Sequence, residues 1–262
     1  MNLRTVNVTR YVTPLREGGS LPAIVEGDDD GTYVLKFRGA GQGPKALIAE
    51  LISGELARAL ELPIPEIAFM ELNPLLGRSE PDYEIRNLLK ASAGLNLALD
   101  YLPGSITFDP LVKKHVVNIS ELASKVVWFD AFITNIDRTA QNTNMLVWHK
   151  QLYLIDHGAS LYFHHSGTEY SARSGDVFAG IKDHVLLPFA DSIADADREL
   201  APKLTPEVIA RVVELIPESW LADEQFADSA QHRTAYEEYF RARLEQPRLW
   251  VKEAIDARER LS

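Results

Sequence analysis

Three residues whose side chains can supply oxygen ligands lie between residues 128 and 158. Asp137 is followed five positions later by Asn142, and Asp156 comes fourteen positions after Asn142. A carboxylate can orient an attacking hydroxyl group, and an amide oxygen with a second carboxylate suits Mg²⁺, which prefers oxygen ligands. This order predicts phosphoryl transfer, with Asp137 as the catalytic residue and Asn142 and Asp156 as metal ligands. Asp and Asn are also common in turns, so an alternative in which Asp137 and Asn142 only cap turns stays open.

The surrounding sequence predicts the elements that position these residues. Ser120 opens a helix whose apolar residues recur at helical spacing. A loop rich in Asn, Asp and Thr follows over residues 135–144. Two short apolar runs, 145–148 and 152–155, then predict a β-hairpin whose second strand leads directly to Asp156. One helix, one loop and one hairpin would therefore bring the three residues together.

The segments NIDRTAQN and LIDHG, which contain these residues, resemble the HipA-like branch of the protein-kinase-like superfamily and, more distantly, the phosphoinositide lipid kinases. The resemblance covers roughly residues 5–190. It implies ATP and Mg²⁺ as cofactors and a serine or threonine of a protein as the acceptor. Those families typically carry D-R-H or D-x-H in the catalytic loop, whereas Thr139 stands at the position of that histidine here. The role of the histidine is therefore not carried over to this chain.

The resemblance also implies the architecture. We expect an α+β, protein-kinase-like bilobal fold, with a small antiparallel β lobe and one helix over residues 1–102. Residues 103–262 would form a larger helical lobe with the catalytic loop, the metal site and a helical tail. HipA proteins carry a further N-terminal subdomain before the ATP-binding core, and we expect this chain to begin directly at that core. The toxin role, the antitoxin partner and the DNA-linked repression of HipA are therefore not transferred.

The residue pattern predicts the individual elements of this fold. Runs rich in β-branched and aromatic residues predict five strands, at residues 6–15, 21–25, 32–37, 66–72 and 95–102. A helix is expected over residues 45–60, and the pattern from 191 to 262 is helical throughout. Residues 73–94 contain prolines and glycines among charged residues, and they predict a loop with little regular structure.

Lys36 lies in the otherwise apolar strand TYVLKF, so burial of its stem is expected, and a buried ammonium group is costly without a partner. Kinases place such a lysine on the third strand, where it holds the α- and β-phosphates and pairs with a helix glutamate. HipA-like sequences have that glutamate six residues before a Leu-Ala pair, which selects Glu50 ahead of Leu56. Glu55 stays open as the alternative partner. A second alternative leaves the Lys36 ammonium group in solvent at a sheet edge.

Gly18, Gly19 and Ser20 fall between the first two predicted strands. Kinases fold a flexible loop over the ATP phosphates at this place, so these three residues are candidate phosphate-binding residues. The segment lacks the pattern G-x-G-x-x-G, and an ordinary hairpin turn accounts for it as well.

Asp100, Tyr101 and Leu102 end the last predicted strand of the small lobe, just before Pro103 and Gly104. In kinases the crossing between lobes offers backbone groups to adenine. These three residues are therefore the candidate adenine-binding residues, with an ordinary strand end as the alternative.

Residues 159–175 follow the predicted metal ligand and contain five serines and threonines. Kinases keep their activation segment at this place. His157, His164 and His165 could suggest a transition-metal site, but the sequence has no cysteine and no H-E-x-x-H pattern near them, so we do not expect one.

Composition narrows the possible partners and compartment. The chain has 27 basic and 38 acidic residues and a net charge of −11, which argues against nucleic-acid or anionic-membrane binding by bulk charge. The absence of cysteine excludes disulfides and zinc–thiolate sites. No apolar run reaches the length of a membrane span, and no signal segment is evident. We therefore expect a soluble, cytoplasmic protein.

Three functions fit these features. The first is an ATP- and Mg²⁺-dependent Ser/Thr protein kinase, whose partners would be ATP and an unidentified protein acceptor. The second is a kinase of a small molecule or lipid, because those enzymes share the same catalytic set. The third is a nucleotide-binding pseudokinase or scaffold. The complete set of Lys36, Asp137, Asn142 and Asp156 disfavours the third, since pseudokinases commonly lose at least one such residue.

Overall fold

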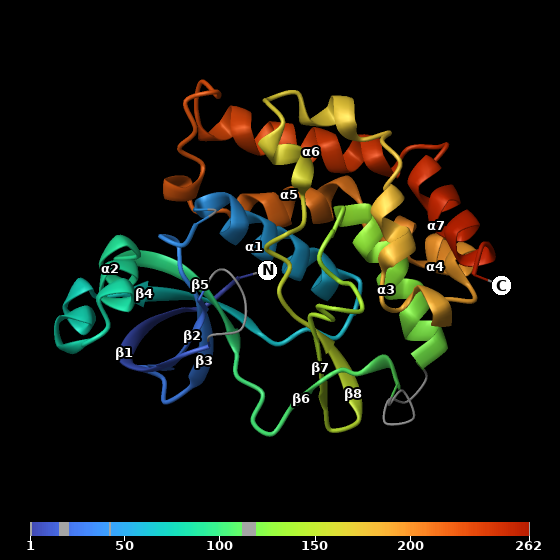
Figure 1. The fold of residues 1–262 in the computed structure, drawn as a ribbon. Coiled ribbons are helices and arrows are strands. Elements are labelled where there is room, and N and C mark those ends of the chain that lie inside the picture. Colours follow the sequence, from blue (N-terminus) through green and yellow to red (C-terminus); the bar gives the residue numbers. More distant parts are fainter. Residues whose placement is uncertain (1, 16–20, 42, 112–118, 262) are drawn as a thin grey trace.

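The computed structural model describes residues 2–15, 21–41, 43–111 and 119–261. It combines strands and helices, as expected for an α+β chain (Figure 1). Its first part is a closed barrel of five strands in the order β1-β2-β3-β5-β4. The strands are β1 (Thr5–Pro14), β2 (Ala23–Gly27), β3 (Thr32–Lys36), β4 (Ile67–Leu72) and β5 (Gly94–Asp100).

The barrel departs in one respect from the expected antiparallel sheet. Strands β1 and β4 pair in parallel, whereas the other neighbouring strands are antiparallel. Parallel neighbours need a long connection, and here the chain passes through β2, β3 and a helix before it reaches β4. Alternation along β3 places Tyr33 and Leu35 in the barrel core. Val34 and Lys36 therefore share the opposite face of the strand.

Helix α1 (Pro44–Ala59) is the long helix of this part of the chain, and it begins with a proline at the position that tolerates one best. All residues from Leu47 to Ala57 are buried. Many of them belong to one core cluster that also includes residues of β5 and the C-terminal helices. In Figure 1, α1 lies beside α5, between the barrel and the helical part of the chain. This burial fixes the position of the helix.

Residues 73–94 correct the expectation of an irregular loop. They form a 3₁₀-helix η1 (Pro74–Ser79) and an α-helix α2 (Tyr83–Ala91). The side chain of Asp82 caps α2 by accepting hydrogen bonds from the amides of the first turn. Ile85 and Leu89, four residues apart, then pack against the barrel core. The prolines and glycines that predicted a loop all lie outside α2, so they do not interrupt its helical pattern.

The middle of the chain contains the expected helix and hairpin. Helix α3 (Ile119–Ile133) ends just before the loop that carries Asp137. Strands β7 (Met145–Trp148) and β8 (Gln151–Leu154) form the predicted hairpin. A short strand that was not predicted, β6 (Ile106–Thr107), adds to the edge of β7. Helix α3 therefore precedes the loop, and a three-stranded sheet holds the residues that follow it.

The rest of the chain is helical, as expected. Its α-helices are α4 (Ile193–Leu200), α5 (Pro206–Glu214), α6 (Ser229–Leu244) and α7 (Leu249–Glu259). Short 3₁₀-helices connect them and follow β8: η3 (Tyr162–His165), η4 (Tyr170–Arg173), η5 (Ala179–Asp183), η6 (Leu187–Phe189), η7 (Ala201–Lys203) and η8 (Glu218–Trp220). Within the described ranges, no helix is both long enough and apolar enough to cross a membrane.

Candidate active site

A cavity of about 930 Å³ lies between the barrel and the β6-β7-β8 sheet, a volume typical of small-molecule sites. Its lining is partly apolar and partly polar, and we call the part at Lys36 and Asp156, which are hydrogen-bonded to each other, the charged end. Its apolar residues include Val34, Pro65, Leu99, Leu102, Met145 and Ile155. Its polar residues include Lys36, Asp100, Asn142 and Asp156. Such a cavity suits a ligand with a flat apolar part and a charged part.

Lys36 reaches the charged end from β3. Its Nζ donates a hydrogen bond to Asp156 Oδ1 at 2.6 Å and lies 4.0 Å from Glu50 Oε2. Burial alone would lower the pKa of Lys36, but the negative charges of Glu50 and Asp156 outweigh it and raise that pKa. Lys36 is therefore a buried, charged ammonium group, and its head does not extend into solvent as the sheet-edge alternative required.

Of the two candidate glutamates, Glu50 is the one beside Lys36. Its Oε2 also accepts a hydrogen bond from the His157 amide at 2.8 Å. Burial would raise the pKa of Glu50, but the Lys36 charge and the contacts with His157 lower it. Glu55 instead pairs with Arg58, at 2.5 Å. Glu50 thus connects α1 to both β3 and the residue after Asp156.

Asp156 stands at the turn that follows β8. Its φ of 56° lies in the left-handed region, which aspartate tolerates better than most residues. Its side chain is 38% exposed and lines the cavity. We name Lys36, Glu50, Asp156 and His157 the cleft cluster. Lys36 and Asp156 line the cavity, and the buried Glu50 contacts both Lys36 and His157.

The loop after α3 brings Asp137 and Asn142 into direct contact. Asn142 Nδ2 donates to Asp137 Oδ2 at 2.8 Å, and Asn144 Nδ2 donates to the same oxygen at 3.1 Å. Because its nitrogen is used in this way, the side-chain oxygen of Asn142 is free to face a cation. Asn142 lines the cavity, and Asp137 contacts it there without being one of the lining residues. The structure therefore brings together the predicted catalytic residue and one predicted metal ligand, and it places both predicted ligands on one cavity.

The donor set at this end fits Mg²⁺. The Asn142 oxygen and the Asp156 carboxylate are hard oxygen donors, and magnesium proteins commonly use one or two such ligands together with substrate phosphates. Among the residues that the structure describes, no group of three or more His, Asp or Glu side chains could hold a metal by itself. The site is thus suited to a metal that arrives with a phosphate ligand.

The predicted adenine-binding residues line the same cavity. Asp100, Tyr101 and Leu102 follow one another out of β5. The Asp100 amide donates to Glu66 O at 2.8 Å, and the Tyr101 amide donates to Thr32 O at 3.0 Å. These bonds fix the backbone at the cavity wall.

The predicted phosphate-binding residues Gly18, Gly19 and Ser20 lie outside the described part of the chain. The residues on either side of the segment, Leu15 and Pro22, both line the cavity. The Leu15 amide donates to Pro22 O at 2.7 Å, so the two ends of the segment are held together at the cavity.

A second group of polar residues, which the sequence interpretation missed, lies behind the catalytic loop. It consists of Asp130, Asn135, Arg138 and His184, and all four are buried. We name it the buried loop cluster. Asp130 Oδ2 accepts hydrogen bonds from Arg138 Nε at 2.6 Å and from His184 Nε2 at 2.8 Å, while Asn135 Nδ2 donates to Oδ1 at 3.0 Å. Burial would raise the pKa of Asp130, but Arg138 and His184 hold it well below its usual range.

One signal in the sequence pointed to this cluster. Asp130 interrupts the apolar helical run VVWFDAFI, and a carboxylate in such a run needs a buried partner. The partner Arg138 stands eight residues later. His184 had no comparable signal, because it is 54 residues from Asp130 and belongs to no motif.

The segment after Asp156, expected to be an activation segment, packs against α6. Phe163 and Tyr170 are buried there, and the Phe163 ring stacks on Tyr239 with centroids 3.5 Å apart. His164 Nδ1 is 3.0 Å from the Tyr236 hydroxyl. His164 therefore has a structural partner, and burial lowers its pKa well below the usual value.

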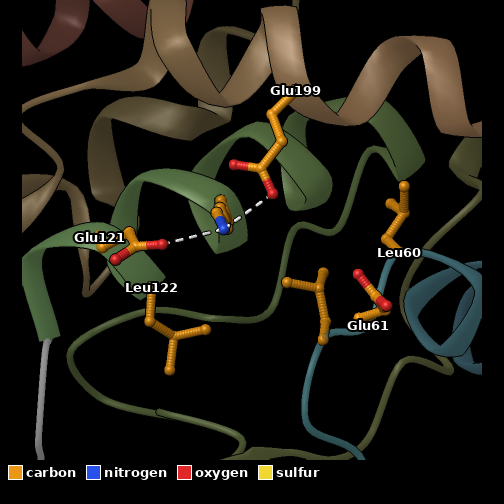
Figure 2. A pocket seen from close by; sticks show the side chains of 7 residues that line it. Leu60, Glu61, Glu121, Leu122 and Glu199 are labelled. Atoms are coloured by element: carbon orange, nitrogen blue, oxygen red, sulfur yellow. Dashed lines mark hydrogen bonds and ion pairs between the residues drawn. The ribbon is translucent and has the colours of Figure 1, made fainter.

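A smaller hollow, of about 340 Å³, contains none of the predicted residues. It lies where the end of α1 approaches α3 and α4, and Figure 2 shows its side chains. Lys125 Nζ bonds Glu121 at 3.0 Å and Glu199 at 2.9 Å. Lys125 thus pairs with two of the three glutamates that line the hollow, and all three glutamates are largely exposed.

Comparison with known proteins identifies the family. The family model described as HipA-like kinase matches residues 8–253. The chain belongs to the HipA-like kinase family. This confirms the resemblance seen in NIDRTAQN and LIDHG. Among curated proteins, none matches the chain.

Solved structures show the fold of this HipA-like kinase. The proinflammatory kinase CtkA of Helicobacter pylori superposes with a TM-score of 0.57 at 13% identity, covering 98% of this chain and 100% of that one. Golgi casein kinase, with Mn/ADP bound, aligns with a TM-score of 0.47 at 12% identity, covering 97% of this chain and 73% of that one. A second structure of Golgi casein kinase gives 0.45 at 11% identity, with coverages of 98% and 72%. The likeness to CtkA shows a kinase fold.

Proposed function

We propose that this HipA-like kinase transfers the γ-phosphoryl group of ATP, with Mg²⁺, to a serine or threonine of a protein. The observation that carries the proposal is the cavity itself, whose lining combines apolar residues such as Leu102 with Lys36, Asn142 and Asp156. ATP has the matching shape, an adenine followed by a triphosphate. The choice of a protein hydroxyl as acceptor rests on the family.

Each residue has a role that its position supports. Leu102 and its neighbours would enclose the adenine, and Lys36 would bind the α- and β-phosphates while Glu50 holds its ammonium group in place. Asn142 and Asp156 would hold Mg²⁺. When bound, Mg²⁺ supplies positive charge next to the β- and γ-phosphate oxygens. Since Lys36 bonds Asp156 at 2.6 Å, we expect this contact to loosen when the nucleotide binds.

Asp137 would act on the acceptor. Asn142 and Asn144 both donate to its Oδ2, which fixes the carboxylate and leaves Oδ1 to accept the proton of the attacking hydroxyl group. The two asparagines thus orient the group without occupying both of its oxygens.

The same proposal includes a two-lobed organisation. Residues 1–102 would form the smaller, nucleotide-binding lobe, and residues 103–262 would form the larger lobe with the catalytic loop. Gly18, Gly19 and Ser20 remain the candidate phosphate-binding residues of this proposal.

The test is transfer of label from [γ-³²P]ATP in the presence of Mg²⁺, using purified protein with and without a cell lysate. The proposal expects label on phosphoserine or phosphothreonine of protein bands, and none after EDTA is added. Label on small molecules or lipids would replace the protein acceptor with the second function considered above. ATP binding with no transfer to any acceptor would indicate a pseudokinase.

Asp137→Asn separates chemistry from binding. We expect it to bind Mg-ATP nearly as the wild type does, because Lys36 and Asp156 are untouched, and to lose about 10²-fold or more in turnover. Nucleotide titration and turnover should be measured on the same preparation. Normal turnover would remove Asp137 from the mechanism, and lost nucleotide binding would make it a binding residue instead.

A further inference from the structure

His184 lies behind the catalytic loop, and both of its ring nitrogens are used. Nδ1 accepts a hydrogen bond from the Leu186 amide at 3.0 Å. An amide can only donate, so Nδ1 carries no proton, and the neutral ring must carry it on Nε2. Nε2 therefore donates to Asp130 Oδ2, at 2.8 Å. The surrounding groups thus select one tautomer and one orientation of the ring.

The backbone at the same place also holds the catalytic loop. His184 forms a β-bridge with Thr139, and the Val185 amide donates to Arg138 O at 3.1 Å. Arg138 and Thr139 are the two residues directly after Asp137. The side chain of His184 therefore contacts the loop by way of Asp130, and the backbone of residues 184–185 contacts it directly.

Asp130 also accepts a hydrogen bond from Arg138, so it connects His184 to that side chain. The guanidinium group of Arg138 bonds Asp130 through Nε at 2.6 Å, and its Nη1 donates to the carbonyl oxygen of Asn144. The same Nη1 lies 3.4 Å from Ile155 O. Asn144 directly precedes β7, and Ile155 directly follows β8. Arg138 is thus joined to both ends of the hairpin that leads to the second metal ligand.

We propose that His184 is a positioning residue, which fixes the catalytic loop and with it the Asp137 carboxylate. A histidine that only filled the core would have no reason to contact the loop by ring and backbone at once. No histidine stands in the loop itself, where Thr139 occupies the position expected for one, and the imidazole that orders this loop comes from residue 184. The effect on turnover rests on the proposed function, whereas the effect on the order of the loop does not.

The first experiment compares kinetics of three variants below their melting temperatures. His184→Leu removes the donor to Asp130, and His184→Gln keeps an N–H donor at about the same distance. His232→Leu is the matched control, because His232 is also buried, at 1% exposure against 5% for His184, but bonds Tyr170 and Leu221 O. We expect His184→Leu to lower kcat by about 10- to 100-fold with little change in KM for ATP. His184→Gln should recover most of kcat, and His232→Leu should retain it.

Equal changes of kcat in His184→Leu and His232→Leu would overturn the proposal, because they would indicate a general loss of structure. A rise in KM without a fall in kcat would also overturn it, because it would place His184 in nucleotide binding.

The second experiment needs no catalysis. Hydrogen exchange should be followed at the amides of Thr139 and Val185, which donate to Asn142 O and Arg138 O. We expect both amides to exchange faster in His184→Leu than in the wild type or in His232→Leu. Unchanged exchange would overturn the inference even if the wild type is an active kinase. Faster exchange in a chain that transfers no phosphate would refute the proposed function and retain the positioning role of His184.

Discussion

The cleft cluster and the buried loop cluster both pair carboxylates with a cation, but they differ in their access to solvent. In the cleft cluster, the Asp156 side chain is 38% exposed and borders the cavity. In the buried loop cluster, the side chains of Asp130 and Arg138 are fully buried. The two clusters meet at the segment 155–156, where Arg138 contacts Ile155 O and Lys36 contacts Asp156.

Both clusters contain buried polar atoms that have no hydrogen-bond partner in the described part of the chain. They are Glu50 Oε1 and His157 Nε2 in the cleft cluster and Arg138 Nη2 in the buried loop cluster. The carboxylates differ, because both oxygens of Asp130 accept hydrogen bonds from buried side chains, whereas Asp156 accepts one from Lys36 and is partly exposed at the cavity. We therefore expect rearrangement on ligand binding in the cleft cluster rather than in the buried loop cluster.

The largest effect on stability should follow from breaking the buried loop cluster. Arg138→Met would leave the Asp130 carboxylate buried without its cation, and we expect the free energy of unfolding to fall by about 3–5 kcal/mol. Lys36→Met should lower the free energy of unfolding by less. The Asp156 carboxylate is partly exposed to water, and Glu50 still accepts a hydrogen bond from the His157 amide. Urea denaturation of both variants measures the difference. Equal losses would show that the two clusters are not distinct in this way.

Nucleotide binding tests the role of the cleft cluster. Mg-ATP at about 100 times its dissociation constant should stabilise the wild type by about 2.7 kcal/mol. Asp156→Asn should lose the magnesium-dependent part of this gain, because it weakens a metal ligand. Thermal melts with ATP and either Mg²⁺ or EDTA give the measurement. The same gain in both proteins would exclude Asp156 as a metal ligand.

The sequence predicted the parts of the site that depend on neighbouring residues. The strand with Lys36, the loop with Asp137 and Asn142 and the hairpin before Asp156 follow from local spacing and polarity. Helix α2 was also within reach, since the Asp82 cap and the pair Ile85 and Leu89 are local signals. The prolines and glycines around it concealed that pattern.

Other features depend on tertiary packing. Which of the two α1 glutamates faces Lys36 is decided by how the helix is rotated against β3, and both are buried. The parallel pairing of β1 with β4 depends on closure of the barrel. The contact of His184 with Asp130 spans 54 residues, and no spacing rule links such distant positions. These features could be found only in the structure.

The two glutamates of α1 give a sharper test of the cleft cluster. Glu50→Gln should lower turnover about tenfold, or about 1.4 kcal/mol of transition-state stabilisation, because Lys36 loses a negative partner. Glu55→Gln, in the same helix, should leave turnover unchanged, since Glu55 pairs with Arg58 away from the cavity. Steady-state kinetics of both variants decide the matter. A loss confined to Glu55→Gln would move the functional partner of Lys36 there.

The smallest expected effect concerns stability in acid, where the same two residues act in opposite directions. The pKa of Glu50 is lowered in the folded chain because Lys36 and His157 outweigh burial. Ionised Glu50 therefore contributes to the free energy of unfolding. This contribution is complete above the pKa of about 4.5 that the group has in the unfolded chain, and it is lost as the pH falls from there toward the pKa in the folded chain. The pKa of Glu55 is raised by burial, so the folded chain takes up that proton first. As the pH falls through the raised pKa of Glu55 toward 4.5, the free energy of unfolding therefore rises.

Each glutamine variant removes one of these two dependences. Glu50→Gln should flatten the fall of stability below pH 4.5, and Glu55→Gln should remove a gain just above it. One group changes the slope by at most about 1.4 kcal/mol per pH unit, so the unfolding free energy should be measured by urea denaturation at closely spaced pH values. Parallel curves for the wild type and Glu50→Gln would contradict a buried, ionised Glu50. Since Glu50 and Asp156 together keep Lys36 charged next to the cavity, such a result would also remove one of the two negative charges on which phosphate binding by Lys36 depends.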